Sequence, residues 1–239
     1  MATYSERGVV LRTIKLGEAD NIVTLVTERR GKVRAVAKGV RRTRSRFGGR
    51  LEPLSHVALL CYEGRNLDTI TQAETLEQFR PVREDLGRWG RASCILEVVD
   101  AVVQEGEDDC RLYQMLLGAL RTLAGGHVPL LVPCFYWKLL AQQGFHPVLD
   151  RCVSCDADGE ELVAFDEGQG GMLCRACRRG TRVSPDALAL LRRILGGDMV
   201  GVLAEQASAA GPELEHLGAR AIEHHLERRL RAPGILDRA

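Results

Sequence analysis

Four of the eight cysteines form two pairs with the spacing of a metal site. Two positions lie between Cys152 and Cys155 and between Cys174 and Cys177, and the stretch 156–173 separates the pairs. A two-residue gap lets one tight turn direct two thiolates at the same point, so two such turns supply the four sulfurs of a tetrahedral Zn²⁺ site. Because four cysteines close the coordination shell, we expect one structural zinc ion per chain and no Lewis-acid chemistry.

Two questions about this module are whether its cysteines bind zinc or act in redox chemistry, and whether the nearby arginines contact nucleic acid. A pair of redox-active CxxC motifs is the alternative to zinc, but a thioredoxin-like site needs a βαβ context that the pattern does not predict. Nearby arginines would favour thiolates and could also contact nucleic acid; they are Arg151, Arg175, Arg178, Arg179 and Arg182. The remaining cysteines lie in apolar or helical contexts and are expected to be buried small hydrophobes; they are Cys61, Cys94, Cys110 and Cys134.

A basic segment at residues 29–50 is the second chemical feature, with ten Lys or Arg residues and no acidic one. The planar guanidinium group of arginine matches phosphate oxygens, and each neutralised phosphate adds to the salt dependence of binding. We expect a strand face followed by a flexible loop, with Val33, Ala35 and Ala37 on the opposite face of that strand. The predicted DNA contacts are Lys32, Arg34, Lys38, Arg41, Arg42, Arg44 and Arg46.

The alternative for the segment is a solvated charged face or a localisation signal, but ten like charges repel one another. Residues 1–80 carry a net charge of +6 and the rest of the chain −5, an asymmetry that indicates an acidic partner. The same N-terminal part contains few aromatic side chains, so base stacking has a small platform. We therefore expect binding driven by the phosphate backbone, tolerant of sequence and sensitive to salt.

The overall composition is that of an ordinary globular protein, with 45% hydrophobic and 27% charged residues in a chain of 239. No run reaches 18 apolar residues, which argues against a membrane span. Glu6, Arg7 and Arg12 occupy the place of a signal peptide's apolar stretch. We expect the protein in the reducing cytoplasm.

The elements that must position the basic segment have the pattern of short β-strands. Alternating and β-branched runs predict strands at residues 8–14, 21–27, 32–38, 57–62 and 68–73. Five short strands in about 80 residues match the size of an OB-fold barrel, although periodicity does not separate this topology from other small barrels.

Helical periodicity begins after Pro81 and is interrupted by the cysteine module. Apolar stripes predict helices at 88–104, 110–123 and 130–143, and then, with Ser184 as N-cap, at 185–195 and 212–230. The fold class is thus α+β and multidomain, with a barrel followed by a helical domain that carries an inserted Cys₄ module. The expected divisions are 1–80, 81–144, 145–182 and 183–239.

Several catalytic signatures are absent from the sequence. It contains no GxxxxGK[ST] motif, so we expect no P-loop ATPase, and it contains neither HExxH nor GxSxG. An acidic run at Glu105, Glu107, Asp108 and Asp109 would suit a nuclease, but charges at a turn and a helix N-terminus are the simpler interpretation. His224 and His225 point about 100° apart on a helix and are expected at the surface.

Short motifs occur in both halves of the chain. In the N-terminal half they are 17–20 with 22–25, 35–39 with Arg41 and Arg42, Ser45 with Arg46, and Leu51 with Pro53. The entry to the cysteine module runs from Gly144-Phe145 through Pro147, Leu149 and Asp150 to Cys152 and Cys155. These motifs resemble the N-terminal domain and the zinc module of the RecO family of bacterial recombination mediators. Some members of the family lack the four cysteines, whereas this chain has all of them.

This resemblance implies an OB-fold, a helical domain and an inserted zinc module in a protein without bond-breaking activity. It implies binding of single- and double-stranded DNA, annealing of complementary strands, and action with RecR to load RecA onto DNA coated by the single-stranded-DNA-binding protein. The C-terminal tail of that coating protein would dock on the helical domain, and the protein would be associated with the nucleoid. By position, Lys38, Arg41, Arg42 and Arg46 would contact DNA.

Two rival functions remain from the residues alone. The first is a regulatory zinc-ribbon protein whose basic arm binds RNA or the transcription machinery. The second is a nuclease that uses Glu105 and Asp108. A preference for one RNA or protein partner would indicate the first, and Mg²⁺-dependent cleavage of DNA the second.

Overall fold

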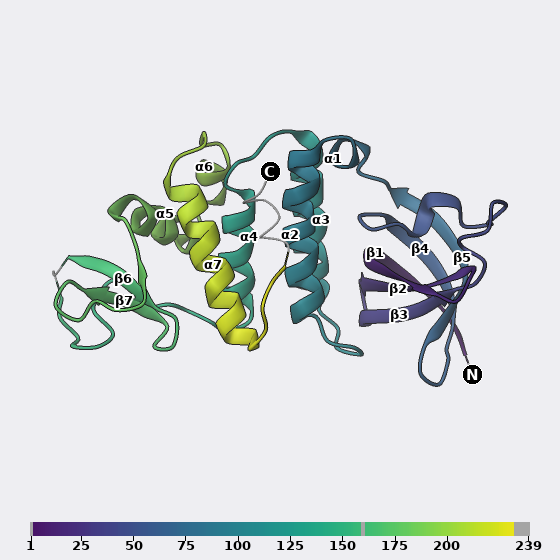
Figure 1. Ribbon diagram of the computed structural model, residues 1–239, viewed down its shortest axis with the longest axis horizontal. Coiled ribbons are helices and arrows are strands. Elements are labelled where there is room, and N and C mark those ends of the chain that lie inside the picture. The colour runs from purple at the N-terminus through teal and green to yellow at the C-terminus, as the bar shows by residue number, and fades with distance from the viewer. Residues whose placement is uncertain (1, 159–160, 232–239) are drawn as a thin grey trace. The chain divides into compact units, whose positions relative to one another are not determined.

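The computed structural model describes residues 2–158 and 161–231 (Figure 1). The chain forms two compact units, Met1–Gly126 and His127–Ala239. The expected division at residue 80 marks the end of the barrel, but the helices that follow it group with the barrel.

The first unit opens with a closed five-stranded barrel of OB-like architecture. Its strands are β1 (Thr3–Leu16), β2 (Asp20–Thr27), β3 (Gly31–Ala37), β4 (His56–Tyr62) and β5 (Asp68–Glu77), in the spatial order β1-β2-β3-β5-β4. All neighbouring strands are antiparallel except β3 and β5. The barrel and its five strands confirm the prediction, and a short 3₁₀ helix, η1 (Gly48–Leu51), follows the basic loop.

Alternation along the strands explains which side chains fill the barrel. Val33, Ala35 and Ala37 of β3 point into its core, as predicted, whereas Arg34 between them is exposed. The strand β1 is much longer than the predicted 8–14 because it pairs twice, with β4 through its first half and with β2 through its second. A register shift between Val10 and Arg12 lies in the second pairing, and shifts of this kind bend strands around a barrel.

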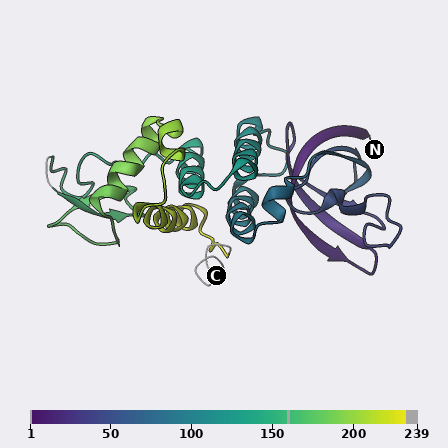
Figure 2. The same cartoon turned by 90° about the horizontal axis from the view of Figure 1, so that it is seen from above.

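Three helices complete the first unit. These are α1 (Arg80–Arg83), α2 (Leu86–Val102) and α3 (Cys110–Gly125), and the two longer ones lie side by side next to the barrel in both views (Figures 1 and 2). Asp85 caps α2 by accepting from the backbone N of Arg88 at 2.8 Å, and Asp109 caps α3 by accepting from Leu112 N at 2.9 Å. Carboxylates at these positions satisfy amides that have no partner within the helix.

The second unit combines helices with the cysteine module. Its helices are α4 (Leu131–Gln142), α5 (Pro185–Gly196), α6 (Met199–Leu203) and α7 (Ala210–Leu226), and its small sheet has the order β7-β6-β8, from β6 (Leu162–Asp166), β7 (Gly171–Cys174) and β8 (Thr181–Arg182). Ser184 caps α5, as predicted, with its Oγ accepting from Ala187 N at 3.2 Å. The last helix is shorter than predicted, because Glu227 adopts a left-handed conformation that ends it.

Two sequence expectations about burial have different outcomes. Cys61, Cys94 and Cys134 are buried, but Cys110 is exposed, which corrects its assignment as a core residue. It is the first residue of α3, directly after the N-cap Asp109, and is not among the residues that this helix buries. None of the helices within the described ranges combines the length and the apolarity that crossing a bilayer requires.

Candidate nucleic-acid interface and metal centre

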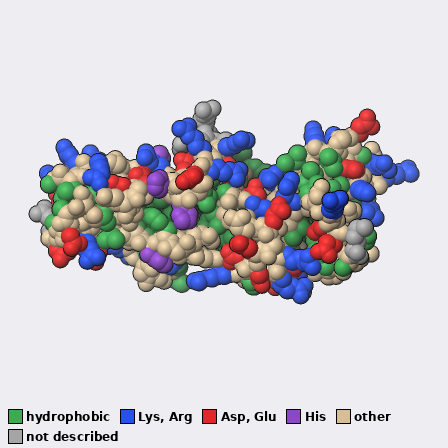
Figure 3. All heavy atoms as spheres, turned by 90° about the horizontal axis from the view of Figure 1, so that it is seen from below, with side chains coloured by type: hydrophobic (Ala, Val, Ile, Leu, Met, Phe, Trp, Pro, Cys, Tyr) green, Lys and Arg blue, Asp and Glu red, His purple; other side chains and the backbone are tan. Residues whose placement is uncertain are grey.

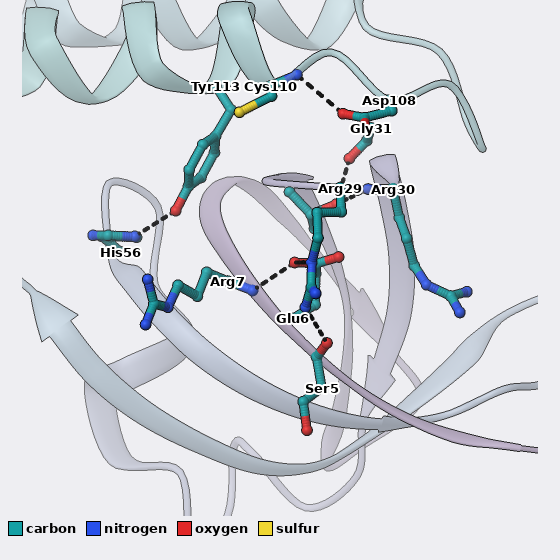
Figure 4. Close-up of polar contacts among 11 residues, drawn as sticks. Ser5, Glu6, Arg7, Arg29, Arg30, Gly31, His56, Asp108, Cys110 and Tyr113 are labelled. Atoms are coloured by element: carbon teal, nitrogen blue, oxygen red, sulfur yellow. Dashed lines mark hydrogen bonds and ion pairs between the residues drawn. The ribbon is translucent and has the colours of Figure 1, made fainter.

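The fold divides the basic segment into two parts with different electrostatic surroundings. Although residues 29–50 contain no acidic residue, tertiary structure brings carboxylates to the first part, which corrects the view of the segment as free of acidic partners. The ion pairs are Arg29–Glu6 at 3.6 Å, Arg30–Glu63 at 3.7 Å, Lys32–Asp100 at 3.5 Å and Arg34–Glu105 at 3.7 Å. Figure 4 shows Arg29 beside β1, where it also donates to the backbone oxygen of Ser5 at 3.2 Å.

The side chain of Lys32 points toward helix α2, so its charge is not available to bind DNA. Its Nζ donates to the backbone oxygen of Asp100 at 2.6 Å, and only 17% of its side chain is exposed. The carboxylate of Asp100 also binds Arg12, whose Nε lies 2.6 Å from Oδ2. The two cations therefore tie β1 and β3 to α2, and Lys32, predicted as a DNA contact, has its charge engaged inside the unit.

Backbone contacts also join β3 to the segment that follows α2. Lys32 N donates to the backbone oxygen of Gln104 at 2.8 Å, just beyond the end of α2. Gly31 has φ +59°, and a Cβ there would lie 2.0 Å from the backbone oxygen of Glu107. Only glycine fits this approach, because other residues would meet both the strain of positive φ and a collision with backbone.

The second part of the segment has a different character. Six of the ten cations belong to it, and they are exposed with no ion pair within the described part of the chain. The guanidinium of Arg50 donates to the backbone oxygens of Arg46 and Phe47. The other five are Lys38, Arg41, Arg42, Arg44 and Arg46. Arg46 lies over the ring of Phe47, with 4.8 Å from its Cζ to the ring centroid. These five charges are thus available to an anionic partner.

Hydrogen bonds and packing hold this loop against the barrel. Gly39 N donates to Oδ1 of Asp20 at 2.7 Å, and Arg41 N donates to the backbone oxygen of Ala19 at 2.9 Å. Val40 and Phe47 pack against the barrel core on either side of the charged residues. The loop expected to be flexible is therefore attached to the turn between β1 and β2.

The space-filling view shows which types of side chain are exposed on one face of the barrel. At the barrel, Lys and Arg side chains lie among exposed hydrophobic side chains (Figure 3). Several unpaired cations along one loop can contact successive phosphates of a nucleic-acid backbone.

The acidic run after α2 has structural partners. Glu105 pairs with Arg34, Asp108 accepts from the backbone N of Cys110 at 3.1 Å (Figure 4), and Asp109 caps α3. Within residues 2–158 and 161–231, the cysteine module is the only cluster of three or more His, Cys, Asp or Glu donors placed for one metal ion. The described structure therefore does not assemble the nuclease site considered from the sequence.

The four cysteines predicted as zinc ligands come together at one point. Cys152, Cys155, Cys174 and Cys177 have Sγ atoms that all lie within 4.8 Å of one another, and Cys155 Sγ is 3.8 Å from Cys174 Sγ. Zinc–sulfur bonds of about 2.3 Å in a tetrahedron imply sulfur–sulfur distances of about 3.8 Å. The donor set and its spacing fit a metal ion closed off by four sulfurs.

The pKa values of cysteines in this cluster are also consistent with a bound cation. Backbone hydrogen bonds, the largest from Cys174, lower the pKa of Cys152 to about 6. The backbone of Ala157 lowers the pKa of Cys155, but hydrogen bonds with Cys152 and Cys177 outweigh it and raise that pKa to about 12. Neighbouring sulfurs therefore do not all ionise together unless a cation compensates their charge.

The arginines near the module contribute less than the sequence suggested. Three are paired with carboxylates, in the pairs Arg151–Asp156, Arg175–Glu161 and Arg179–Asp166. Arg178 and Arg182 are exposed and make no ion pair within the described residues. The lowered pKa of Cys152 has backbone amides as its main cause, and these replace the arginines in that role.

One polar network was missed by sequence reasoning. The buried His56 lies between Tyr113 of α3, with Nε2 at 2.7 Å from its hydroxyl, and Glu77 of β5, with Nδ1 at 2.9 Å from Oε1. Arg121 of α3 donates to the same Glu77 carboxylate at 2.7 Å. These partners lie far from His56 along the chain, so no local pattern could have revealed the network.

Comparisons with known proteins cover the whole chain. Residues 1–79 match the family described as recombination protein O N terminal, and residues 83–233 match recombination protein O C terminal. The chain is 42% identical to a DNA repair protein RecO of Frankia casuarinae over all of both chains. It is 43% identical to one of a Nocardioides species over 98% of this chain and 99% of that protein, and 42% identical to one of Thermobifida fusca over all of both.

Proposed function

This chain belongs to the RecO family of DNA repair proteins, and from this premise we propose that it is a recombination mediator that binds single- and double-stranded DNA and anneals complementary strands without ATP. The observation that carries the proposal is the exposed loop at residues 38–46. Its five cations have no acidic partner in the described structure and are attached to the barrel.

The proposed DNA contacts are Lys38, Arg41, Arg42, Arg44 and Arg46, with Arg34 at their edge. Arg34 keeps 42% of its side chain exposed although it pairs with Glu105. Lys32 is left out because its charge is engaged by Asp100. Cations on one side of a small barrel can hold phosphates without reading bases, so we expect tolerance of sequence.

Annealing without ATP follows from the same surface. Two complementary strands repel each other through their phosphates, and a patch of fixed cations lowers that repulsion when both strands approach it. Base pairing then supplies the free energy, so the protein needs no bond-breaking chemistry. In this role the protein is not an enzyme.

We assign one structural Zn²⁺ per chain to the four clustered cysteines. When bound, the ion would cross-link the turn at Cys152 and Cys155 to the turn at Cys174 and Cys177. The chain's own contribution is a set of backbone amides that favours the first thiolate, as the lowered pKa of Cys152 indicates. The arrangement supports a structural role, since four cysteines leave no position for a substrate.

The partners of the proposed function are those that membership of the family suggests. They are RecR, the C-terminal tail of the single-stranded-DNA-binding protein and, indirectly, RecA. The protein would act in the cytoplasm, in association with the nucleoid through its DNA binding.

The salt dependence of DNA binding tests this proposal. Replacing Arg41, Arg42, Arg44 and Arg46 by alanine should flatten the plot of log Kobs against log salt by up to about 0.7 to 0.9 units for each phosphate that is no longer neutralised. Alanine at Arg29, which pairs with Glu6, is the matched control and should leave the slope unchanged. An unchanged slope in the fourfold variant would place the DNA site elsewhere, and a strong preference for one RNA would favour the regulatory zinc-ribbon function.

A further inference from the structure

The four clustered cysteines differ in their contact with solvent, and we propose that a peroxide oxidises the exposed part of the cluster and thereby releases the metal ion reversibly. The proposal rests on the zinc site of the proposed function and deepens it by assigning a redox-sensitive switch to the same cysteines. Its two states are a reduced module that holds the ion and an oxidised module that does not.

Burial divides the cluster into two inner and two outer cysteines. The inner ones, Cys152 and Cys174, are 0% and 2% exposed, whereas the outer Cys155 is exposed and the outer Cys177 is half-buried. Each CxxC turn thus places its first cysteine inside the module and its second nearer to solvent. The susceptibility of a cysteine to oxidation follows its exposure, so a peroxide in solution reaches Cys155 first.

Packing in the small sheet explains why the inner cysteines are covered. Cys174 is the last residue of β7, a strand buried along its whole length, and it is paired with Leu162 of the neighbouring β6 (Figure 1). The turn of the other inner cysteine is held against the same strand, because Val153 N donates to the backbone oxygen of Met172 at 2.9 Å. Both outer cysteines lie in the turns themselves, outside the strands.

The sulfur atoms are close enough for an oxidation in two steps. Cys155 Sγ lies 3.8 Å from Cys174 Sγ, and all four sulfurs lie within 4.8 Å of one another. In the first step the Cys155 thiolate attacks hydrogen peroxide, so that a sulfur–oxygen bond forms, the oxygen–oxygen bond breaks and hydroxide leaves. In the second step a neighbouring thiolate attacks the Cys155 sulfenic acid, which forms a disulfide and releases a second hydroxide. The peroxide gains the two electrons that the two sulfurs lose.

A disulfide within the cluster leaves two thiolates, and a structural zinc site needs four ligands. The oxidised module therefore no longer holds the ion. A disulfide between Cys155 and Cys174 joins the two CxxC turns to each other, so the four sulfurs stay close together. Exchange with a reducing dithiol returns both thiols and converts the dithiol to its own disulfide. The site can then bind zinc again, which makes the change a switch.

The stretch between Cys177 and Gly180 shows what the switch would move. Gly180 fixes one end against β6, because it has φ +74° and a Cβ there would lie 2.3 Å from the backbone oxygen of Phe165. The other end is fixed through Cys177 when the metal is bound. Four arginines of this region line a cavity of about 760 Å³ beside the start of α5; they are Arg175, Arg178, Arg179 and Arg182. We expect oxidation to release the Cys177 end and to rearrange these charges.

The test measures zinc release from the purified, zinc-loaded full chain after exposure to hydrogen peroxide. A chromophoric chelator reports free zinc, and mass spectrometry after alkylation of the remaining thiols identifies the oxidised cysteines. Cys155→His and Cys152→His separate the outer from the inner position, since each retains four ligands in a Cys₃His set. The control is Cys110→Ser, because Cys110 is exposed and belongs to the other compact unit.

We expect the wild-type protein and Cys110→Ser to release about one zinc for each disulfide formed, and the first disulfide to contain Cys155. A dithiol with added zinc should restore the metal content. Cys155→His should release zinc about tenfold more slowly than the wild type, because its most exposed sulfur is gone, and Cys152→His should release it at nearly the wild-type rate. Hydrogen exchange in residues 175–182 should become faster on oxidation and slow again on recovery.

Three results would overturn the inference. In the first, the wild-type protein keeps its zinc at peroxide concentrations that oxidise Cys110. In the second, its first disulfide does not contain Cys155, a result that depends on the folding of neither variant. In the third, reduction with added zinc fails to restore the metal, which would indicate damage and not a switch. Each of these leaves the zinc assignment intact, whereas reduced wild-type protein without zinc would overturn that assignment together with the inference.

Discussion

At the scale of single residues, the decisive distinction is between cations that are used inside the fold and cations that are not. Lys32 lies near the start of β3, and Lys38 directly follows the end of the same strand. The first is held by Asp100, and the second is exposed with no ion pair among the described residues. The same residue type therefore serves stability at one position and is free for a ligand at the other.

These two lysines give a reciprocal prediction. Lys32→Met should lower the free energy of unfolding by about 1–3 kcal/mol, because it leaves the buried Asp100 with Arg12 as its remaining cation. Lys38→Met should change stability by no more than about 0.5 kcal/mol but should reduce the salt slope of DNA binding. Denaturant titration and binding at several salt concentrations measure the two effects. Equal effects of the two substitutions in both assays would contradict the division of the basic segment.

His56 gives a prediction about pH. Burial lowers its pKa below the usual 6.5, although the hydrogen bond to Glu77 opposes this. The unfolded chain therefore binds the proton more readily than the folded chain, and stability is lost as pH falls below about 6.5 toward the pKa of the folded chain. The free energy of unfolding should decrease from pH 7 to pH 5.5, and His56→Gln should make that decrease smaller. The control is His216→Gln, at an exposed position of α7; an identical pH dependence in all three proteins would refute the role of His56.

At the scale of elements, the connection between β3 and the end of α2 is the most sharply determined local feature. Gly31 and Gly17 both have positive φ, +59° and +57°. A Cβ at Gly31 would collide with the backbone of Glu107, whereas a Cβ at Gly17 would have no atom within 4 Å. Substitutions at these two glycines can therefore distinguish the cost of backbone strain alone from the cost of strain together with a steric collision.

The predicted effects of alanine at these glycines differ accordingly. Gly17→Ala should cost about 1–2 kcal/mol, the penalty of the left-handed conformation alone. Gly31→Ala should cost about 3–5 kcal/mol, since overpacking against backbone adds to that penalty. Urea denaturation of both variants measures the difference, and equal destabilisation would show that the β3–α2 connection yields without cost.

The cysteine module gives the second prediction at this scale. Metal analysis of protein purified without chelator should find about one zinc per chain, and Cys155→Ser should abolish it while Cys110→Ser does not. Because a closed Cys₄ site contributes folding free energy directly, chelation should remove hydrogen-exchange protection from β6 and β7. The barrel strands belong to the other compact unit and should keep their protection. Protein with well under one zinc per chain, or protection of β6 that survives chelation, would count against a structural metal.

Some elements could be predicted from the sequence and others could not, for physical reasons. Local signals were sufficient for the β3 alternation, the Ser184 cap and the two CxxC turns, since each depends on residues within a few positions. The double pairing of β1, the ion pair of Lys32 with Asp100 and the contact of His56 with Tyr113 join residues that are far apart in the chain. Composition and periodicity contain no information about such contacts, which is why Lys32 was assigned to DNA.

At the scale of the whole molecule, a small net charge is combined with an uneven distribution of charge along the chain. The net charge is +1, but positions 1–80 carry +6 and the remainder −5. A uniform surface of this net charge would attract DNA only weakly, whereas cations gathered at one loop create a local positive field. The proposed annealing therefore depends on where the charges lie more than on their number.

The measurement that tests the central claim most directly is the annealing of two complementary single strands without any nucleotide cofactor. The rate is compared for the wild-type protein, for the variant with alanine at Arg41, Arg42, Arg44 and Arg46, and for the Arg29→Ala control. We predict that the wild-type protein and the control accelerate annealing and that the fourfold variant, still folded, loses most of this acceleration. A wild-type protein that binds both strands but leaves the rate unchanged, or a fourfold variant as active as the wild type, would contradict the account.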